Sequence, residues 1–400
     1  MKVSSEGLQR HAALFFAMMA SGGNNIVLRE VWVVLTCVTC LSLLRWRIPL
    51  RTSRNLIYIW LILLVVLLFF LQGLSSIVSI ASRMLTFVAA IMLVEVYLSR
   101  SLDRLKSDLF NILSLMSVQA ILTSFLGNLV DGLFWTVNVN GRDYLTLFYL
   151  FNFHYVHEEV ARYVRPDGFF YEPGVFQIYL SIFLYLCLFW RFSMYWVAAA
   201  LVALVTVWST IGLGIAAALL VLSSWRLLSH LRGMKLVLLL AAYVAMLPVA
   251  VTLTMNNYNE KVTGELRGSF LARQYDLYTG MNVIKEKPLT GIGFGLDAYL
   301  RFNLTAGYQA SELAVEQTND RPNSNGLVQV LYTIGIPLGL PLLLGMATQR
   351  LFRPRLPMAI LLAWSFYGQS LVFTPFFLFI LLSGFIFGPN VVNKLRTPQT

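Results

Sequence analysis

The segment Arg165-Pro-Asp-Gly-Phe-Phe-Tyr-Glu172-Pro173-Gly174-Val-Phe-Gln177 combines charged residues with Pro and Gly and then enters a long apolar stretch. The chain of 400 residues around it is 58% hydrophobic and only 12% charged. One soluble core cannot hide that much apolar surface, so the composition indicates a protein that crosses a membrane several times. A charged loop at a membrane boundary is where such a protein has room for chemistry.

Apolar runs long enough to cross a bilayer recur along the whole chain. A hydrocarbon core about 30 Å thick takes roughly 20 helical residues per span, and only helices or closed barrels can span lipid. The runs are continuous and do not alternate, which predicts helices. We therefore expect an all-α polytopic transmembrane helical bundle, a single domain over 1–400, with spans near 11–27, 31–44, 55–73, 77–98, 109–130, 174–190, 194–207, 210–225, 234–254, 326–348, 357–372 and 374–388.

The basic residues indicate how the bundle is oriented. Most of them lie in short loops or at the termini, and these positions all fall on one side of the predicted spans. Short cytoplasmic loops carry an excess of Lys and Arg, so both termini are predicted to be cytoplasmic. The net charge of +11 thus reports topology and not a nucleic-acid partner. The long segments 131–173 and 255–325 become the first and second external loops, where a site has room.

The first external loop contains apolar residues at helical spacing over 152–165. This spacing predicts a short amphipathic helix on the membrane surface, which Pro166 would stop. Arg162 and Arg165, three residues apart, would then share one face of that helix.

The second external loop contains a charged stretch with helical spacing. It predicts a helix over 267–287 that ends before Pro288. The following Gly291-Ile-Gly293-Phe-Gly295 predicts a turn. Because it follows a helix and not a strand, it does not support a dinucleotide site.

Arg165 and Arg273 are the leading candidates for a functional site. Each lies near a Pro or Gly turn in an external loop that must fold back onto the bundle. A guanidinium group stays charged, and its planar fork binds a diphosphate through two contacts. The other external arginines, among them Arg162 and Arg267, fit a solvated or ion-paired role better and are weaker candidates.

Arg83 lies inside the span 77–98, about six residues from its external end. An arginine near the middle of a span costs roughly 2.5–3.5 kcal/mol on insertion scales, so its side chain must extend to the interface or face a polar cavity. Both interpretations stay open. In the second, Arg83 adds a positive charge to the same external pocket.

Glu172 precedes Pro173-Gly174 at the head of the span 174–190. A carboxylate there is favoured by the helix dipole and by unpaired N–H groups, which makes it a helix cap. A role as general base needs a nearby acceptor hydroxyl. The pair His154 and His157 is not a recognised ligand pattern, so we expect neither a metal nor a cofactor.

Three motifs resemble one superfamily in the same order. Arg165-x-x-Gly168-x-Phe170-x-Glu172-Pro173-Gly174 resembles a segment of Wzy-type O-antigen and exopolysaccharide polymerases. Arg273 followed by Pro288-Leu-Thr-Gly291-Ile-Gly293-Phe-Gly resembles a loop of the wider O-antigen ligase and polymerase superfamily. Asn325-Gly-Leu-Val-Gln-Val-Leu-Tyr-Thr-Ile-Gly335-Ile-Pro-Leu-Gly339 resembles the span after that loop.

The resemblance implies a metal-independent, inverting integral-membrane glycosyltransferase at the outer face of the bacterial inner membrane. A polymerase transfers a growing glycan from undecaprenyl diphosphate to a lipid-linked repeat unit. A chain-length regulator and a flippase are the expected partners. On this basis Arg165 and Arg273 hold the diphosphate, and Glu172 either orients Arg165 or activates the acceptor hydroxyl. Further candidates for substrate binding are Arg83, Arg162, Arg267 and Asn325.

Other functions remain open. Ligases of the superfamily typically carry His just before the Asn, whereas this chain reads Asn323-Ser324-Asn325, which favours a polymerase over a ligase. A lipid-linked glycan flippase or transporter would also be a polytopic bundle with intramembrane charge. It would show inverted repeats and interrupted spans in both halves. A non-catalytic scaffold would leave the loop arginines unexplained.

Overall fold

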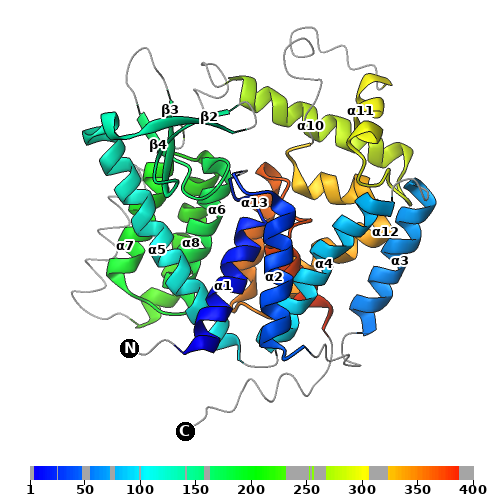
Figure 1. The fold of residues 1–400 in the computed structure, drawn as a ribbon, viewed down its shortest axis with the longest axis horizontal. Helices are drawn as coiled ribbons and strands as arrows, with labels where there is room; N and C mark the ends of the chain where they lie inside the picture. Colours follow the sequence, from blue (N-terminus) through cyan, green and yellow to red (C-terminus); the bar gives the residue numbers. More distant parts are fainter. Residues whose placement is uncertain are drawn as a thin grey trace.

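The computed structural model describes residues 4–24, 26–46, 55–72, 77–98, 101–139, 142–156, 163–230, 252, 255, 267–305 and 323–386. Most of these residues are helical (Figure 1). The helices are α1 (Ser5–Met19), α2 (Arg29–Leu43), α3 (Asn55–Gln72), α4 (Ile77–Leu98), α5 (Leu102–Leu129), α6 (Pro173–Phe189), α7 (Met194–Val207), α8 (Thr210–His230), α10 (Arg267–Glu286), α11 (Leu296–Thr305), α12 (Gly326–Thr348), α13 (Arg355–Gly368) and α14 (Pro375–Leu382).

Helix α6 starts at the Glu172-Pro173-Gly174 segment and forms the centre of the bundle. Pro173 occupies the first turn, where its fixed φ and missing N–H are tolerated. Every residue of α6 except Gly174 is buried, as expected for a helix that is apolar on all faces. The ring of Tyr179 stacks on Phe170 at 4.5 Å between centroids. The charged segment is thereby packed against the helix that it begins.

Four of the described helices are long and apolar enough to cross a membrane, namely α3, α4, α5 and α12. Shorter apolar helices occupy Pro173–Phe189, Met194–Val207, Thr210–Ser224 and Pro375–Phe385. These features are consistent with a helical membrane protein. The full set of twelve spans stays a prediction, and the span expected at 234–254 lies outside the described residues except for residue 252.

The first predicted external loop folds as a four-stranded antiparallel sheet in the order β1 to β4. Its strands are β1 (Trp135–Val139), β2 (Arg142–Leu147), β3 (Phe151–Val156) and β4 (Tyr163–Pro166). Figure 1 shows this sheet on the same side of the bundle as α10 and α11, which belong to the second predicted external loop. The two loops therefore meet the same end of the bundle.

The sheet corrects two predictions. The fold is not all-α, and the amphipathic helix predicted over 152–165 is wrong, because this stretch contributes β3 and β4. Phe153 pairs with Leu145 of β2 and packs with Phe134 and Val164 in a small apolar cluster. Strand pairing and this burial outweigh a helical spacing that has no apolar partner surface. Arg165 lies on a strand, so the helical face expected to join it to Arg162 is not formed.

Both predictions for the Arg267–Gly295 stretch are confirmed. Helix α10 covers Arg267–Glu286 and ends before Pro288. Gly291 and Gly293 have φ of +64° and +80°, in the left-handed region that favours glycine. The chain therefore turns sharply between α10 and α11.

Helix α12 is interrupted at Gly335, whose φ is 72° and ψ is 165°. The break frees backbone carbonyls from the helix, and the Gly291–Gly295 turn uses them. Ile292 N donates to Tyr332 O at 2.8 Å, and Gly293 N donates to Thr333 O at 2.9 Å. An interrupted span is tolerated when its freed polar groups find such partners. This interruption fixes the turn against α12.

Candidate functional site

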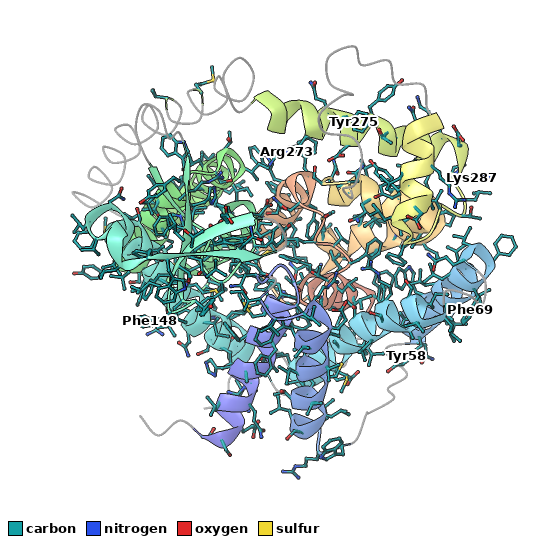
Figure 2. The ribbon with its side chains drawn as sticks, turned by 45° about the horizontal axis from the view of Figure 1, so that its top comes forward. Tyr58, Phe69, Phe148, Arg273, Tyr275 and Lys287 are labelled. Carbon is teal, nitrogen blue, oxygen red and sulfur yellow. The ribbon has the colours of Figure 1, made fainter. Side chains whose placement is uncertain are left out.

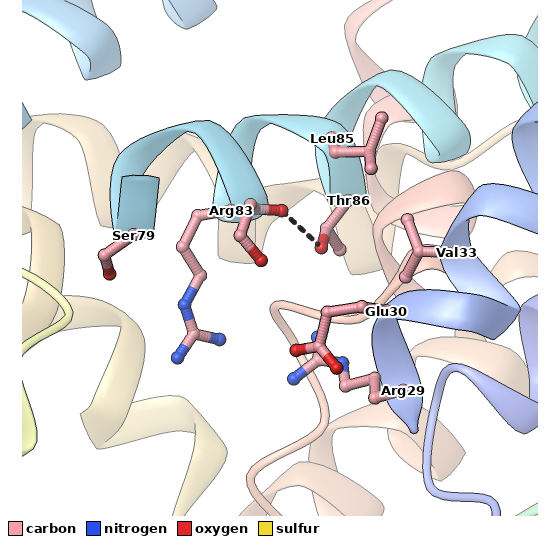
Figure 3. A pocket seen from close by; sticks show the side chains of 8 residues that line it. Arg29, Glu30, Val33, Ser79, Arg83, Leu85 and Thr86 are labelled. Atoms are coloured by element: carbon pink, nitrogen blue, oxygen red, sulfur yellow. Dashed lines mark hydrogen bonds between the residues drawn. The ribbon is translucent and has the colours of Figure 1, made fainter. Parts of the chain in front are cut away.

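Two neighbouring cavities share Arg29 and Arg83. The first, about 240 Å³, lies between α2 and α4, as Figure 3 shows. The second, about 290 Å³, extends from the same arginines to the Gly293–Gly295 turn, α12 and the connection from α13 to α14. Elements far apart in sequence therefore meet around one pair of positive charges.

Arg83 reaches this site from α4. Its guanidinium carbon lies 5.3 Å from the centre of the Phe294 ring, within the range of a cation–π contact. Phe294 in turn meets Phe373 edge to face at 4.8 Å. The Gly293–Gly295 turn thus supplies an aromatic support for an arginine of a distant helix. Of the two interpretations of Arg83, the structure favours the one that faces a cavity.

Arg29 is the second positive charge of the site. Its Nη2 donates to the backbone oxygen of Phe373 at 3.0 Å. It precedes the predicted span 31–44, and burial lowers the pKa of its guanidinium to about 10. The positive charge of Arg83 lowers that pKa further, whereas the carboxylate of Glu30 raises it. Two like charges held this close favour an anion between them.

The second cavity has a mixed lining beyond the arginines. Aromatic side chains and hydroxyl groups both line it, and Tyr299 stacks on Tyr332 at 5.1 Å between centroids. A ligand that carries a negative group and a larger polar body fits this arrangement. The lining residues are Arg29, Arg83, Gly293, Phe294, Gly295, Leu296, Tyr299, Gln329, Tyr332, Thr333, Ser370, Phe373 and Thr374.

Glu172 contacts the connection between α13 and α14, which contributes Ser370 to the lining of the second cavity. It takes the N-cap position of α6, as predicted, but its side chain makes no capping hydrogen bond. Its Oε1 accepts a hydrogen bond from Nε2 of Gln369, and Gln369 also accepts one from the Tyr171 hydroxyl at 3.2 Å. The carboxylate therefore positions the α13–α14 connection.

Arg165 lies on β4 and lines neither of the two cavities. Its Nε donates to the backbone oxygen of Val207 at 2.9 Å, which ties the sheet to the end of α7. In the strand register Arg165 is opposite His154. The ring Nδ1 of His154 lies 3.0 Å from Oδ2 of Asp167.

Arg273 is a half-buried residue of α10, on the side of the second predicted external loop (Figure 2). It is also absent from the lining of both cavities. Arg267 begins α10 but its side chain lies outside the described part of the chain, and Arg162 lies outside it altogether. The predicted grouping of Arg162 and Arg267 with Arg83 in one pocket therefore stays a prediction.

Asn325 is the N-cap of α12. Its Oδ1 accepts from the backbone N–H groups of Leu327 and Val328, both at 3.1 Å. Nearby, Oδ2 of Asp276 accepts from the backbone N and the hydroxyl of Ser324 at 2.9 and 2.6 Å. The start of α12 is therefore fixed to α10, and it places Tyr332 and Thr333 at the cavity.

Metal-binding groups are scarce in the part of the chain that the structure describes. Within it, no three His, Cys, Asp or Glu side chains lie close enough to hold a metal ion. His157, the second histidine of the pair considered above, lies outside that part.

Residues 206–343 match the family model described as O-antigen ligase. This match covers about a third of the chain. This match confirms the resemblance to the O-antigen ligase and polymerase superfamily and indicates a membrane enzyme of glycan assembly. The matched region contains the Gly291–Gly295 turn and the interruption of α12. Neither the curated proteins nor the solved structures contain a significant match to the chain.

Sequence reasoning missed Arg29. The signal was present, because Arg29 stands at the predicted external end of a span, just as Arg83 lies near the external end of another. What the sequence does not contain is the distance between the two spans. That distance depends on the packing of α2 against α4.

Proposed function

We propose that this protein is a polysaccharide polymerase. It transfers a growing glycan from undecaprenyl diphosphate to a lipid-linked repeat unit at the outer face of the bacterial inner membrane. The observation that carries the proposal is the Arg29–Arg83 pair, shared by two cavities beside the turn of the O-antigen ligase domain.

In this reaction an acceptor hydroxyl attacks the anomeric carbon of the donor sugar. The new glycosidic C–O bond forms as the bond from that carbon to the diphosphate oxygen breaks, with inversion. The leaving diphosphate keeps the electron pair, and the hydroxyl proton passes to a base or to water. Fixed guanidinium groups in a partly dry site stabilise the charge that develops on the leaving group. This chemistry places the diphosphate at Arg29 and Arg83.

Arg165 and Arg273 line neither cavity, so their proposed role as diphosphate ligands on the external side is an alternative to the Arg29–Arg83 pair. Their elements, β4 and α10, lie on the side of the bundle where both loops gather (Figure 1). Arg162 and Arg267 are further candidates for contacts with the same substrate. The proposed role of Asn325 in substrate binding is indirect. Its side-chain oxygen caps α12 and so positions the start of that helix.

Profiles of lipid-linked glycan in cells that lack the protein test the proposal. Single repeats on the external side, restored to a ladder by the wild type, identify a polymerase. Arg83→Ala should lower ladder formation about a hundredfold, the usual effect of removing one donor to a developing oxyanion. Arg301→Ala is the matched control, because Arg301 is exposed on α11 and lines neither cavity. A normal ladder from Arg83→Ala at normal protein level would contradict the proposed site.

The same assay separates the two roles of Glu172. Glu172→Gln retains an oxygen that accepts from Gln369 but cannot accept a proton. A ladder from this variant assigns Glu172 to positioning, whereas loss of the ladder with the protein still accumulating assigns it to proton transfer.

A ligase is the second candidate, because O-antigen ligase is the description of the matched family. Full-length chains left on undecaprenyl diphosphate in the deletion strain would identify a ligase. Repeats trapped on the cytoplasmic side would identify a flippase and would exclude the polymerase mechanism.

A further inference from the structure

The turn between β2 and β3 has an unusual backbone for its sequence. Phe148 and Tyr149 both have positive φ, 55° and 56°, and Leu150 N donates to Leu147 O at 3.2 Å. A turn with two successive left-handed residues normally contains Asn and Gly. Aromatic residues are disfavoured there, so their presence points to a role for the side chains.

The side chains of this turn are exposed and apolar. Phe148 is 68% exposed, Tyr149 47% and Leu150 46%. Trp135 of β1, 40% exposed, meets the rings of Phe148 and Tyr149 edge to face at 6.1 and 6.2 Å. We call these four residues the aromatic tip. Figure 2 shows Phe148 at the outer edge of the molecule.

The aromatic tip lies against the candidate membrane span α5. Nε2 of Gln119 donates to the backbone oxygen of Leu150. Gln119 precedes Leu129, the end of α5, by ten residues, or about 15 Å of helix. The tip is therefore set back along the span from its end. Beside Gln119 runs an exposed apolar stripe of α5 with the spacing of one helical face, formed by Leu115, Val118, Leu122, Phe125 and Leu129.

The opposite end of the same strand is polar. At the β1–β2 end, Asp143 is exposed and its Oδ1 accepts from Nδ2 of Asn138 at 2.7 Å. Six residues of β2 span about 20 Å. The β1–β2 end of strand β2 is therefore suited to water. The β2–β3 end continues the exposed apolar surface of α5.

We propose that the aromatic tip inserts into the membrane on the side of the two predicted external loops and anchors the β-sheet there. Lipid is the occupant because the tip is continuous with the apolar stripe of α5, and because Trp and Tyr favour the membrane interface. The anchor has a consequence for the site. β4 pairs with β3, so the tip holds Arg165 at a fixed height near the lipid headgroups.

Depth-dependent quenching tests the anchor in the purified full chain, reconstituted in lipid bilayers. The three native cysteines, Cys37, Cys40 and Cys187, are buried and are replaced by Ala. A fluorophore is then attached through Phe148→Cys or Leu150→Cys, and Asp143→Cys at the polar end serves as control. The quenchers are a nitroxide on the lipid acyl chain and iodide in water.

The anchor predicts that the acyl-chain nitroxide quenches the label at either tip position several-fold more than the label at Asp143→Cys. Iodide should show the reverse order. Iodide quenching at the tip equal to that at Asp143→Cys would overturn the proposal in favour of a tip in water. Protection of the tip from both quenchers would also overturn it, because another protein or a second copy would then cover the tip. Neither outcome depends on glycan polymerisation.

Discussion

Two arginines define the candidate site at the level of single residues. Arg29 is anchored to the Phe373 carbonyl and Arg83 to the face of Phe294, and those two rings contact each other. Each positive charge therefore has a fixed place before any ligand binds. Holding two like charges together is unfavourable in the free protein, and an anionic ligand relieves that repulsion. The same preorganisation stabilises a leaving diphosphate.

The lowered pKa of Arg29 leads to a prediction about pH. In wild type burial lowers the pKa of Arg29 to about 10, so the guanidinium stays charged at neutral pH and loses its proton only as the pH rises through about 10. Lysine has an ordinary pKa of about 10.4, and the same burial beside Arg83 would lower the pKa of the Arg29→Lys variant below that value. Chain elongation by Arg29→Lys on lipid-linked repeats should therefore fall at a lower pH than elongation by wild type.

The comparison is made by elongation assays over a pH series with wild type, Arg29→Lys and the exposed control Arg301→Lys. Wild type and control should keep the same profile across the range in which Arg29→Lys loses activity. Coincident profiles for all three would show that the charge at position 29 has no part in elongation.

At the level of elements, the site depends on the interruption of α12. Gly335 breaks the helix, and the freed carbonyls of Tyr332 and Thr333 bind the N–H groups of Ile292 and Gly293. This pairing places the ring of Phe294 in cation–π contact with the guanidinium group of Arg83. In a continuous α12 the carbonyl of Tyr332 would pair with the N–H of Ile336, and only the carbonyl of Thr333, four residues before Pro337, would lack a helical donor. The interruption therefore belongs to the construction of the cavity and is more than a local irregularity.

Gly335→Ala should uncouple the turn from α12. A Cβ at this position would overlap the carbonyl oxygen of Leu289, and the positive φ disfavours any side chain. We expect a loss of at least ~2 kcal/mol of unfolding free energy from steric overlap and backbone strain. Unfolding in detergent measures the loss of stability. The polymerisation assay measures the effect on activity of uncoupling the turn from α12.

Gly339→Ala is the matched control in the same helix. The nearest atoms to a Cβ there are 3.1 Å away and belong to the side chains of Leu331 and Val330, and the residue has no positive φ. It should therefore be tolerated much better. Equal stability of the two variants would contradict the structural role of the interruption.

At the level of the whole molecule, the ends of the bundle differ in character. The sheet, α10 and α11 gather on one side (Figure 1), and α11 contributes Leu296 and Tyr299 to the second arginine cavity. On α1 and α5, whose first residues are predicted to be cytoplasmic, Nε of Arg10 lies 2.8 Å from Oδ2 of the buried Asp108. Which end faces the cytoplasm stays a prediction from the distribution of basic residues.

Accessibility of single cysteines tests that orientation. In the cysteine-free background, Asp143→Cys lies in the sheet and Asp103→Cys in the first turn of α5, and both positions are exposed. A membrane-impermeant maleimide applied to spheroplasts should label Asp143→Cys and leave Asp103→Cys unlabelled until the membrane is opened. The reverse pattern would invert the topology and place the arginine cavities on the cytoplasmic side.

The sequence by itself determined the membrane class, the helix of α10, the turn at Gly291–Gly295 and the superfamily. These follow from local properties, namely hydrophobic length, proline and glycine positions and short motifs. The sheet in the first external loop did not follow, because the spacing over 152–165 suits a helix until β2 and the Phe134 cluster offer it partners.

Only the tertiary structure decided which charged residues meet. Arg83 was recognised as unusual because burial of a charge in a span is costly wherever it occurs. Arg29 was not, because its significance comes from the packing of α2 beside α4 and from the Phe373 carbonyl in a segment more than three hundred residues away. A cavity is a property of surfaces brought together in space, and the interruption of α12 that shapes it depends on hydrogen bonds between distant segments.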